Sequence, residues 1–182
     1  MVRALKELSN EGIEGIIIGD TCLNMEMGNK TFEGDIDLFV TSTSPLLEAN
    51  KINEIAREKG WSIGVTTLGT PSITMTVNDE EVVVELFENI MDFYIPQELI
   101  ELCKQEYEIS GEKISCISKE CWMVLKARRG SNQDLAKLSM VIELAKKNDI
   151  KIDKNKLRNA IELFQDESLH IYERLKNLGL RF

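Results

Sequence analysis

The sequence predicts an α+β fold: a mixed β-sheet core flanked by helices, followed by a C-terminal helical bundle. Up to about residue 117, short apolar runs with strand-like patterns alternate with segments of helical spacing. That mixture is typical of a sheet with flanking helices. From residue 118 onward only helical spacing continues. We therefore expect an α/β core over 1–117 and a helical subdomain over 118–182.

Turn and cap residues delimit the predicted elements of the core. Ser44-Pro45 supplies a cap residue and a first-turn proline for a helix that Gly60 ends. Asn78-Asp79-Glu80 separates two strands of a hairpin, and Ser110-Gly111 turns a weaker hairpin. In chain order the expected elements are helix 1–11, strand 15–18, helix 20–29, strand 35–41, helix 44–60, strand 61–66, strands 72–77 and 81–87, a helix from Pro96 to about Lys104, and a hairpin within 107–117.

The C-terminal part is expected to consist of helices alone. We place them at about 118–129, 133–147, 154–165 and 167–178. Amphipathic spacing does not decide between their possible tasks, which are capping an active site, binding a substrate or forming a dimer.

Composition is that of an ordinary globular protein, with 43% hydrophobic and 29% charged residues. The formal charge of −9 argues against broad, charge-driven binding to nucleic acid or anionic lipid. A local basic cluster is nevertheless present at Lys126, Arg128 and Arg129. No apolar run reaches the roughly 20 residues that cross a bilayer, and no signal peptide is evident, so we expect a cytoplasmic protein without a membrane segment.

The cysteines and the histidine offer little for catalysis. Cys22, Cys103, Cys116 and Cys121 have no C-x-x-C spacing, and we expect buried free thiols. The alternative is an approach of Cys116 to Cys121 across a strand-to-helix junction. The single histidine, His170, falls in a C-terminal helix. A histidine base is therefore a poor hypothesis.

Three carboxylates are the strongest chemical signal. Asp35 and Asp37 are one residue apart on a predicted strand, where alternation directs them to the same face. Glu85 interrupts the apolar run Val82-Val83-Val84 of a later strand, where an ionised group is costly unless it is solvated, paired or metal-bound. If the two strands are neighbours, the three acids converge. Mg²⁺ suits such a site, two ions are expected, and Mn²⁺ is an alternative.

The order of these motifs resembles the nucleotidyltransferase superfamily that shares the DNA polymerase β-like fold. The pattern is a strand, a glycine turn opening a helix, an Asp-x-Asp strand, and a third acid on a later strand. The matching runs are Ile18-Gly19-Asp20-Thr21, Gly34-Asp35-Ile36-Asp37 and Val84-Glu85-Leu86-Phe87. The resemblance implies that Asp35, Asp37 and Glu85 are catalytic metal ligands and that Gly19, Asp20 and Thr21 bind the nucleotide at the triphosphate turn.

Within this superfamily the chain is similar to minimal nucleotidyltransferases and to the toxin component of AbiE-type abortive-infection systems. Those proteins have a basic helix followed by a Lys-Asp-Leu sequence. Here Lys126 and Arg129 precede Gln133-Asp134-Leu135. The resemblance implies that Lys126 contacts nucleotide phosphates, that Arg129 offsets charge, and that Asp134 orients Lys126 or helps deprotonate an acceptor.

Two residues depart from the family pattern. Asp20 stands where glycine or serine is usual, and a carboxylate beside a triphosphate costs about 1–4 kcal/mol at ~4 Å unless a cation intervenes. Asp20 is therefore either an additional metal ligand or the mark of a weakened nucleotide site. Gln133 replaces the lysine of the downstream motif and removes one positive charge.

The leading hypothesis is a metal-dependent transferase that moves a nucleotidyl group from an NTP, such as ATP, to a hydroxyl acceptor and releases pyrophosphate. The alternative is a catalytically degenerate relative that binds a nucleotide or a partner protein. A third interpretation is one half of a toxin–antitoxin pair that acts on tRNA. The expected partners are an NTP, a tRNA or protein acceptor, and a cognate antitoxin or a second copy of the chain.

Overall fold

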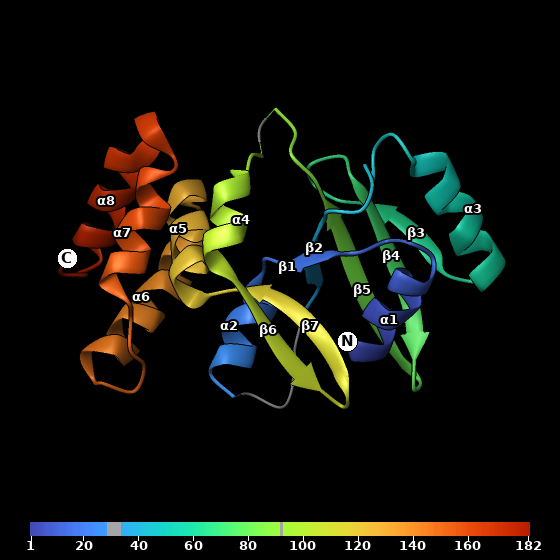
Figure 1. The fold of residues 1–182 in the computed structure, drawn as a ribbon, viewed down its shortest axis with the longest axis horizontal. Coiled ribbons are helices and arrows are strands. Elements are labelled where there is room, and N and C mark those ends of the chain that lie inside the picture. Colours follow the sequence, from blue (N-terminus) through green and yellow to red (C-terminus); the bar gives the residue numbers. More distant parts are fainter. Residues whose placement is uncertain (29–33, 92) are drawn as a thin grey trace. The chain divides into compact units, whose positions relative to one another are not determined.

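A seven-stranded sheet with strand order β3-β4-β5-β2-β1-β7-β6 organises the N-terminal part of the chain (Figure 1). This computed structural model describes residues 1–28, 34–91 and 93–182. The sheet is mixed, because β2 runs parallel to β5 and antiparallel to β1. The predicted α+β fold class is confirmed.

The helices and strands follow the predicted order. The sheet strands are β1 (Gly15–Ile17), β2 (Ile36–Val40), β3 (Ser62–Val65), β4 (Pro71–Val77), β5 (Glu80–Phe87), β6 (Lys104–Ile109) and β7 (Glu112–Ile117). The helices are α1 (Val2–Asn10), α2 (Asp20–Glu26), α3 (Ala49–Lys59), α4 (Gln97–Cys103), α5 (Lys119–Arg129), α6 (Asn132–Lys146), α7 (Lys154–Glu162) and α8 (Ser168–Asn177), with the short 3-10 helix η1 (Gln165–Glu167) before α8. Residue 29, the predicted end of the second helix, lies outside the described residues.

Two compact units make up the chain. The first comprises Met1–Ile95 and Gln105–Cys116, and the second comprises Pro96–Lys104 and Ile117–Phe182. The predicted division into 1–117 and 118–182 stays a prediction, because both of these units are discontinuous in the sequence. The segment that contains α4 belongs instead to the second, helical unit, although it precedes β6 in the sequence.

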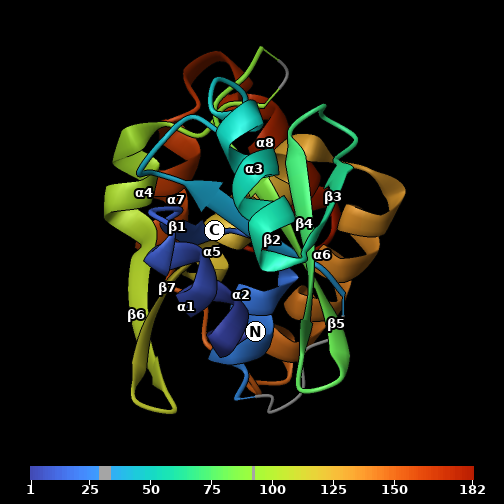
Figure 2. The same cartoon turned by 90° about the vertical axis from the view of Figure 1, so that its right-hand side faces the viewer.

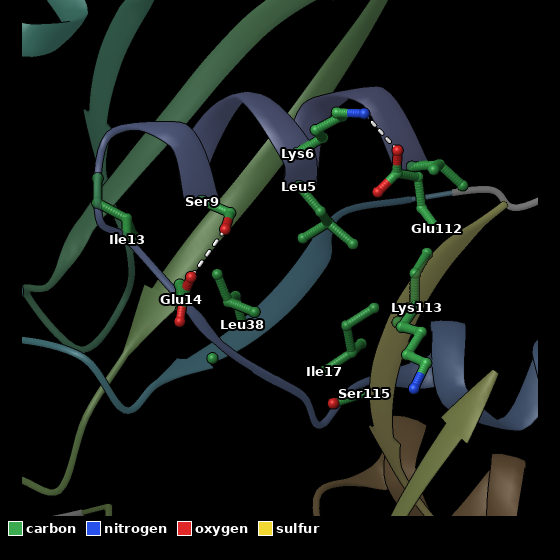
Figure 3. Close-up of a pocket in the computed structure, with 13 residues that line it drawn as sticks. Leu5, Lys6, Ser9, Ile13, Glu14, Ile17, Leu38, Glu112, Lys113 and Ser115 are labelled. Carbon is green, nitrogen blue, oxygen red and sulfur yellow. Dashed lines mark hydrogen bonds and ion pairs between the residues drawn. The ribbon is translucent and has the colours of Figure 1, made fainter. Parts of the chain in front are cut away.

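One face of the sheet is apolar and covered by helices. Ile36, Leu38 and Val40 of β2 are all buried, as the alternation in the sequence predicted. Figures 1 and 2 show α1 and α3 on this side of the strands. A cavity of about 260 Å³ remains beneath α1, and Ile17 and Leu38 contribute to its wall (Figure 3).

The two predicted hairpin turns have the backbone geometry that tight hairpins require. Asn78 and Asp79 both have positive φ, at 52° and 65°, between β4 and β5. Ser110 and Gly111 have φ of 54° and 80° between β6 and β7. Asparagine, aspartate and glycine tolerate this left-handed conformation best, so Asn78, Asp79 and Gly111 suit their positions.

The helix predicted to begin at Ser44-Pro45 starts later, at Ala49, and that part of the prediction was wrong. Glu88 explains the delay. Its carboxylate accepts hydrogen bonds from the Ser44 hydroxyl at 2.9 Å and from the Leu46 N–H at 2.7 Å. These bonds satisfy the local donors in a turn instead of a helix. The predicted end at Gly60 holds, with Gly60 in the left-handed conformation.

The second unit packs around α5. Trp122, Met123 and Val124 are fully buried, and α5 contacts α6, α7 and α8. Arg174 of α8 donates hydrogen bonds from Nη1 to the carbonyls of Ala127 and Arg128, at 2.7 and 2.6 Å. The C-terminal carbonyls of α5 are thereby satisfied by a cation, which is the charge that a helix C-terminus favours.

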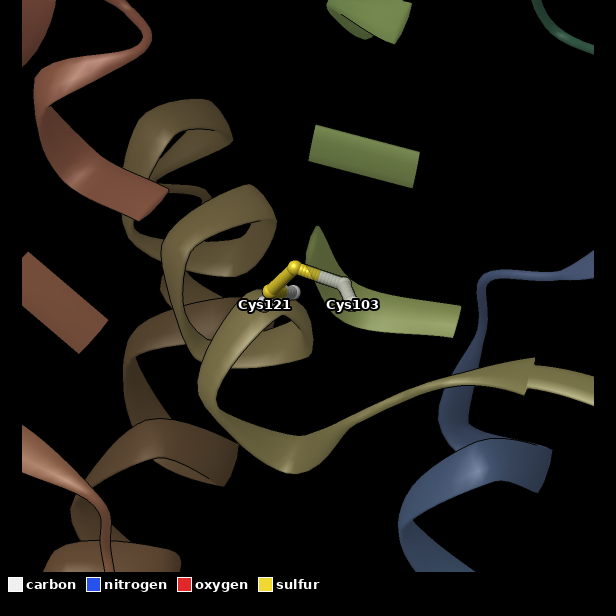
Figure 4. The surroundings of a disulfide bond; sticks show 2 residues. All are labelled: Cys103 and Cys121. Carbon is white, nitrogen blue, oxygen red and sulfur yellow. A yellow bond between two sulfur atoms is a disulfide. The ribbon is translucent and has the colours of Figure 1, made fainter. Parts of the chain in front are cut away.

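The expectation of four free thiols was wrong. Cys103 at the end of α4 and Cys121 in α5 form a disulfide, with Cα atoms 6.1 Å apart (Figure 4). That Cα separation is within the normal range for the bond. Cys22 and Cys116 are free and buried. Cys116 lies in the first unit, and the sequence did not reveal that α4 joins α5 in the second.

Among the described residues, no helix combines the length and the apolar character that spanning a membrane requires.

Candidate functional site

Asp37 of β2 and Glu85 of β5 are directly opposite each other in the parallel strand pair. Their side chains therefore leave the same face of the sheet, the one opposite Leu38 and Leu86. Both acids are half-buried. Two carboxylates that are 48 positions apart in the sequence are thus brought together by strand register.

Asp35 is less regularly placed. β2 begins at Ile36, so Asp35 precedes the strand and is exposed, and strict alternation does not determine its direction. Within the described ranges, no group of three histidine, cysteine, aspartate or glutamate side chains is arranged to hold a metal ion. A cluster of all three acids remains a prediction.

Gly19 lies against the Asp37 side chain. A Cβ atom at position 19 would overlap Oδ2 of Asp37 and come within 2.6 Å of its Cγ. The Ile18 N–H also donates to the Asp37 carbonyl at 2.9 Å. Gly19 has a φ of −90°, so its absent side chain is required for space and not for a left-handed turn. The sequence indicated a turn here, but the contact with Asp37 depends on β1–β2 pairing.

The remaining residues of this turn differ in accessibility. Asp20 is the first residue of α2 and is half-buried, where its negative charge complements the helix dipole. This placement gives Asp20 a structural role whether or not a metal is bound. Thr21 is only 4% exposed, which leaves little of its hydroxyl for a ligand. Phosphate binding by Gly19, Asp20 and Thr21 remains a prediction.

A residue that the sequence analysis did not select extends the acidic pair. Ser72 of β4 is the register partner of Glu85, and Gly64 of β3 is the partner of Ser72. A Cβ atom on Gly64 would lie 2.7 Å from the Ser72 hydroxyl oxygen. Gly64, Ser72, Glu85 and Asp37 therefore form one row across four strands. The polar alternation in 72–77 was visible in the sequence, but its alignment with Glu85 required the register.

An aromatic cluster adjoins this row on the same sheet face. Phe39 and Phe87, two residues beyond Asp37 and Glu85, are register partners. Their ring centroids lie 6.5 and 5.4 Å from that of Phe93. The acidic pair thus has an apolar boundary on one side, which lowers the local dielectric and strengthens electrostatic interactions.

The donor set is compatible with a hard divalent cation. Carboxylate oxygens are the ligands that Mg²⁺ prefers, and it is commonly held by one or two carboxylates together with substrate phosphates. Asp37 and Glu85 supply two such groups side by side. Gly19 lets the Asp37 carboxylate lie against the backbone of the turn, because any larger residue at position 19 would collide with it. A site completed by a nucleotide therefore does not need a third protein carboxylate.

A second polar cluster lies within the helical unit. Arg129 donates from Nε and Nη2 to the two carboxylate oxygens of Asp134, at 2.6 and 2.5 Å. The Ser131 hydroxyl donates to Asp134 at 2.7 Å, and Lys126 Nζ lies 3.5 Å from it. Ser131 and Asp134 also form a reciprocal capping box at the start of α6.

Asp134 is almost completely buried, at 1% exposure, yet it is held as a carboxylate. Burial raises its pKa, but hydrogen bonds from Arg129 and Ser131 and the charges of Arg129 and Lys126 outweigh burial and keep the pKa well below its ordinary value. Such a group is a weak base. The arrangement therefore favours the predicted orienting role of Asp134 over the deprotonating one.

The basic run of α5 is not a uniformly solvated face. Lys126 is 9% exposed, with its ammonium 5.7 Å from the centre of the Trp122 ring. Arg128 forms a two-point pair with Glu167. Only Arg129 has a largely exposed side chain, and Gln133 on α6 is exposed as well. Nucleotide binding by Lys126, Arg129 and Asp134 remains a prediction.

The mixed sheet, with acids paired across β2 and β5 behind a glycine turn, defines a nucleotidyltransferase-type core. The model of the family described as "Nucleotidyl transferase of unknown function (DUF2204)" matches residues 1–177. The chain belongs to this family and is an enzyme of the nucleotidyltransferase class. No curated protein matches the sequence significantly.

The chain is similar to solved structures, one of which supports the fold. An antigenic nucleotidyltransferase-like protein from Paracoccidioides brasiliensis has a TM-score of 0.58 at 15% identity, over 96% of this chain and 89% of that one. The lincosamide antibiotic adenylyltransferase LnuA, solved with lincomycin bound, has a TM-score of 0.48 at 16% identity, over 87% of this chain and 92% of that one. The first of these likenesses supports the fold alone. The narrower similarity to AbiE-type toxins has no specific support and stays a prediction.

Proposed function

We propose that this chain transfers a nucleoside monophosphate group from an NTP to a hydroxyl acceptor, in a reaction that depends on Mg²⁺ and releases pyrophosphate. The observation that carries the proposal is the register pairing of Asp37 with Glu85. The close packing of the glycine turn against the Asp37 carboxylate supports it. Mn²⁺ is the expected substitute cation, because it also accepts oxygen ligands.

In the proposed step, the acceptor oxygen forms a bond to the α-phosphorus. The bond from the α-phosphorus to the oxygen bridging the β-phosphate breaks, and pyrophosphate leaves with that electron pair. Glu85 receives the acceptor proton, and Asp37 helps to hold the nucleotide in line. A divalent ion, when bound, stabilises the negative charge that develops on the phosphoryl oxygens and on the leaving group.

The proposed ligands are Asp37 and Glu85, with Asp35 joining them from the start of β2. Gly19 and Thr21 would position the β- and γ-phosphates through the turn. Asp20 would act as a further ligand, which offsets its repulsion from the phosphates. Lys126 and Arg129 are proposed to balance phosphate charge, with Asp134 orienting both, since Asp134 already contacts both of them.

The acceptor and the partners are proposed by class. A hydroxyl on tRNA or on a protein is the expected acceptor, ATP is one expected donor, and a cognate antitoxin or a second copy of the chain is the expected partner. A cytoplasmic location is also proposed.

A direct test uses labelled NTPs, Mg²⁺ and candidate acceptors with the wild type and the Asp37→Ala variant. Label should move to an acceptor only with the wild type. Asp79→Asn, at the tip of the β4–β5 turn, is a control that neutralises an acid of the same sheet without touching the pair and keeps a residue that tolerates positive φ. The proposal fails if no NTP is bound and none yields labelled product.

A catalytically degenerate nucleotide-binding protein is the second candidate. Asp20 at the turn, the buried Thr21 hydroxyl and the neutral Gln133 favour it. Calorimetry separates the two candidates, because a degenerate protein should bind NTP equally well after Asp35 and Asp37 are replaced by alanine.

A further inference from the structure

A basic groove in the helical unit is lined by residues from the C-terminal end of α6, the loop before α7, α8 and the segment that follows α8. Its volume is about 1150 Å³, as large as a ligand pocket. Five cationic residues contribute to its wall: Lys146, Lys151, Lys154, Lys176 and Arg181. In the described part of the chain, no aspartate or glutamate is among the lining residues.

Asp149 is an exposed acid between the lining residues Asn148 and Ile150, and two other acids near the groove in the sequence are engaged in local contacts. Glu143 pairs with Lys146 at 2.6 Å on an exposed turn of α6. The Asp153 carboxylate accepts the N–H groups of Asn155 and Lys156 and caps α7. The other four cations of the groove have no such carboxylate partner among the described ion pairs, and all four are exposed.

Charge is divided unequally between the two units. The first unit has 7 lysines and arginines against 20 aspartates and glutamates, a net charge of −13. The second unit has 15 against 11, a net charge of +4. The overall charge of −9 therefore conceals a basic unit, and such asymmetry indicates a polyanionic partner for that unit.

Apolar side chains line the groove together with the cations. Ile150, Ile152 and Phe182 line the same groove, and the Phe182 ring packs edge-on against Tyr172 at 4.9 Å. Sites for single-stranded nucleic acids combine these two features, cations along the phosphate backbone and an aromatic or apolar surface beneath the bases. A free phosphate would need only one or two of the five cations.

We propose that this groove binds a single strand of RNA through its phosphodiester backbone. Lys151, Lys154, Lys176 and Arg181 contact phosphates, and Phe182 supports a base. This site is separate from the transfer reaction, because every lining residue belongs to the helical unit and none is a proposed catalytic residue.

The test is fluorescence anisotropy with a labelled single-stranded RNA of about 12 nucleotides, a length within the usual site sizes. NTP and divalent ions are left out, so failure of the proposed transferase activity does not affect the result. With four phosphates contacted, the slope of log K against log salt should be near −2.8, and affinity should fall about 50-fold between 50 and 200 mM salt.

Charge reversal locates the site. Lys151→Glu combined with Lys176→Glu should reduce the slope by about 1.4 and weaken binding at least ten-fold. The matched control is Lys147→Glu combined with Lys51→Glu, which makes the same charge change at two exposed lysines outside the groove. Circular dichroism should show that both double variants are folded.

Equal weakening by both double variants would overturn the proposal, since binding would then follow total charge alone. Absence of RNA binding at 50 mM salt would also overturn it. Binding to phosphatidylserine vesicles without binding to RNA would assign the groove to a membrane surface instead.

Discussion

Asp37 and Glu85 face each other across the parallel β2–β5 pair, one on each strand, at the same level of the sheet. Their neighbours Ile36, Leu38, Val84 and Leu86 are buried on the opposite face. Two ionised carboxylates this close repel each other, and a cation between them relieves the repulsion. The paired carboxylates therefore favour the binding of a cation.

Removing either charge should abolish transfer while the sheet remains intact. We expect Asp37→Asn and Glu85→Gln each to lower the rate of label transfer at least about 100-fold. Glu81→Gln is the matched control, because Glu81 is an exposed acid on the same strand. Equal activity of Glu85→Gln and the wild type in a single-turnover assay would exclude a role for Glu85.

Gly19→Ala should weaken metal-dependent NTP binding, because the new methyl group would overlap the Asp37 carboxylate. We expect at least about a ten-fold loss of affinity by calorimetry, and about 1–3 kcal/mol of destabilisation from crowding. Gly64→Ala is the companion variant, which crowds Ser72 and leaves Asp37 untouched. If Gly19→Ala binds Mg²⁺-NTP like the wild type, the turn does not border the nucleotide site.

Because Asp134 is buried as a carboxylate, we expect the protein to lose stability as the pH falls. Its pKa is lowered in the folded protein, so its contribution is present above its unfolded pKa and is lost as pH falls from about 5 toward 2. Asp134→Asn should cost on the order of 3 kcal/mol at pH 7, because Arg129 and Lys126 lose their buried partner. Urea unfolding of wild type and variant across pH 3 to 7 measures this.

The difference in unfolding free energy between the two proteins should shrink as pH falls. Asp149→Asn, at an exposed acid outside the cluster, should show no such convergence. A difference that stays constant across the pH range would contradict a lowered pKa for Asp134.

The Cys103–Cys121 bond should stabilise the helical unit. It closes a loop with a sequence separation of 18, for which cross-linking contributes about 3 kcal/mol. Alkylation of the denatured protein should therefore modify two cysteines before reduction and four after it, and reductant should lower the melting temperature. Cys121→Ser should melt at the same temperature with and without reductant. Four modified cysteines without reduction would contradict the bond.

Much of the fold follows from local signals in the sequence. Positive-φ residues at Asn78-Asp79 and Ser110-Gly111 set both hairpins, because few other residues tolerate that backbone. Gly60 ended its helix where expected. The helix start at Ser44 failed because Glu88, 44 residues away, offers a competing acceptor that no local pattern reveals.

The candidate site, like the fold, was only partly predictable from the sequence. Residue types and parity selected Asp37 and Glu85, since alternation on each strand is a local property. Their alignment, the row through Ser72 and the Gly19–Asp37 contact depend on register between distant strands. The contact between Asp134 and Arg129 likewise depends on the conformation of the turn between α5 and α6. The disulfide depends on α4 belonging to the helical unit, which no local pattern in the sequence indicates.

The most direct test of the central claim is calorimetric titration with a non-hydrolysable NTP, with and without Mg²⁺, for the wild type, Asp37→Asn and Glu85→Gln. The carboxylate pair predicts binding by the wild type that requires Mg²⁺ and is lost in both variants. Binding of equal strength in all three proteins, or binding indifferent to Mg²⁺, would contradict it.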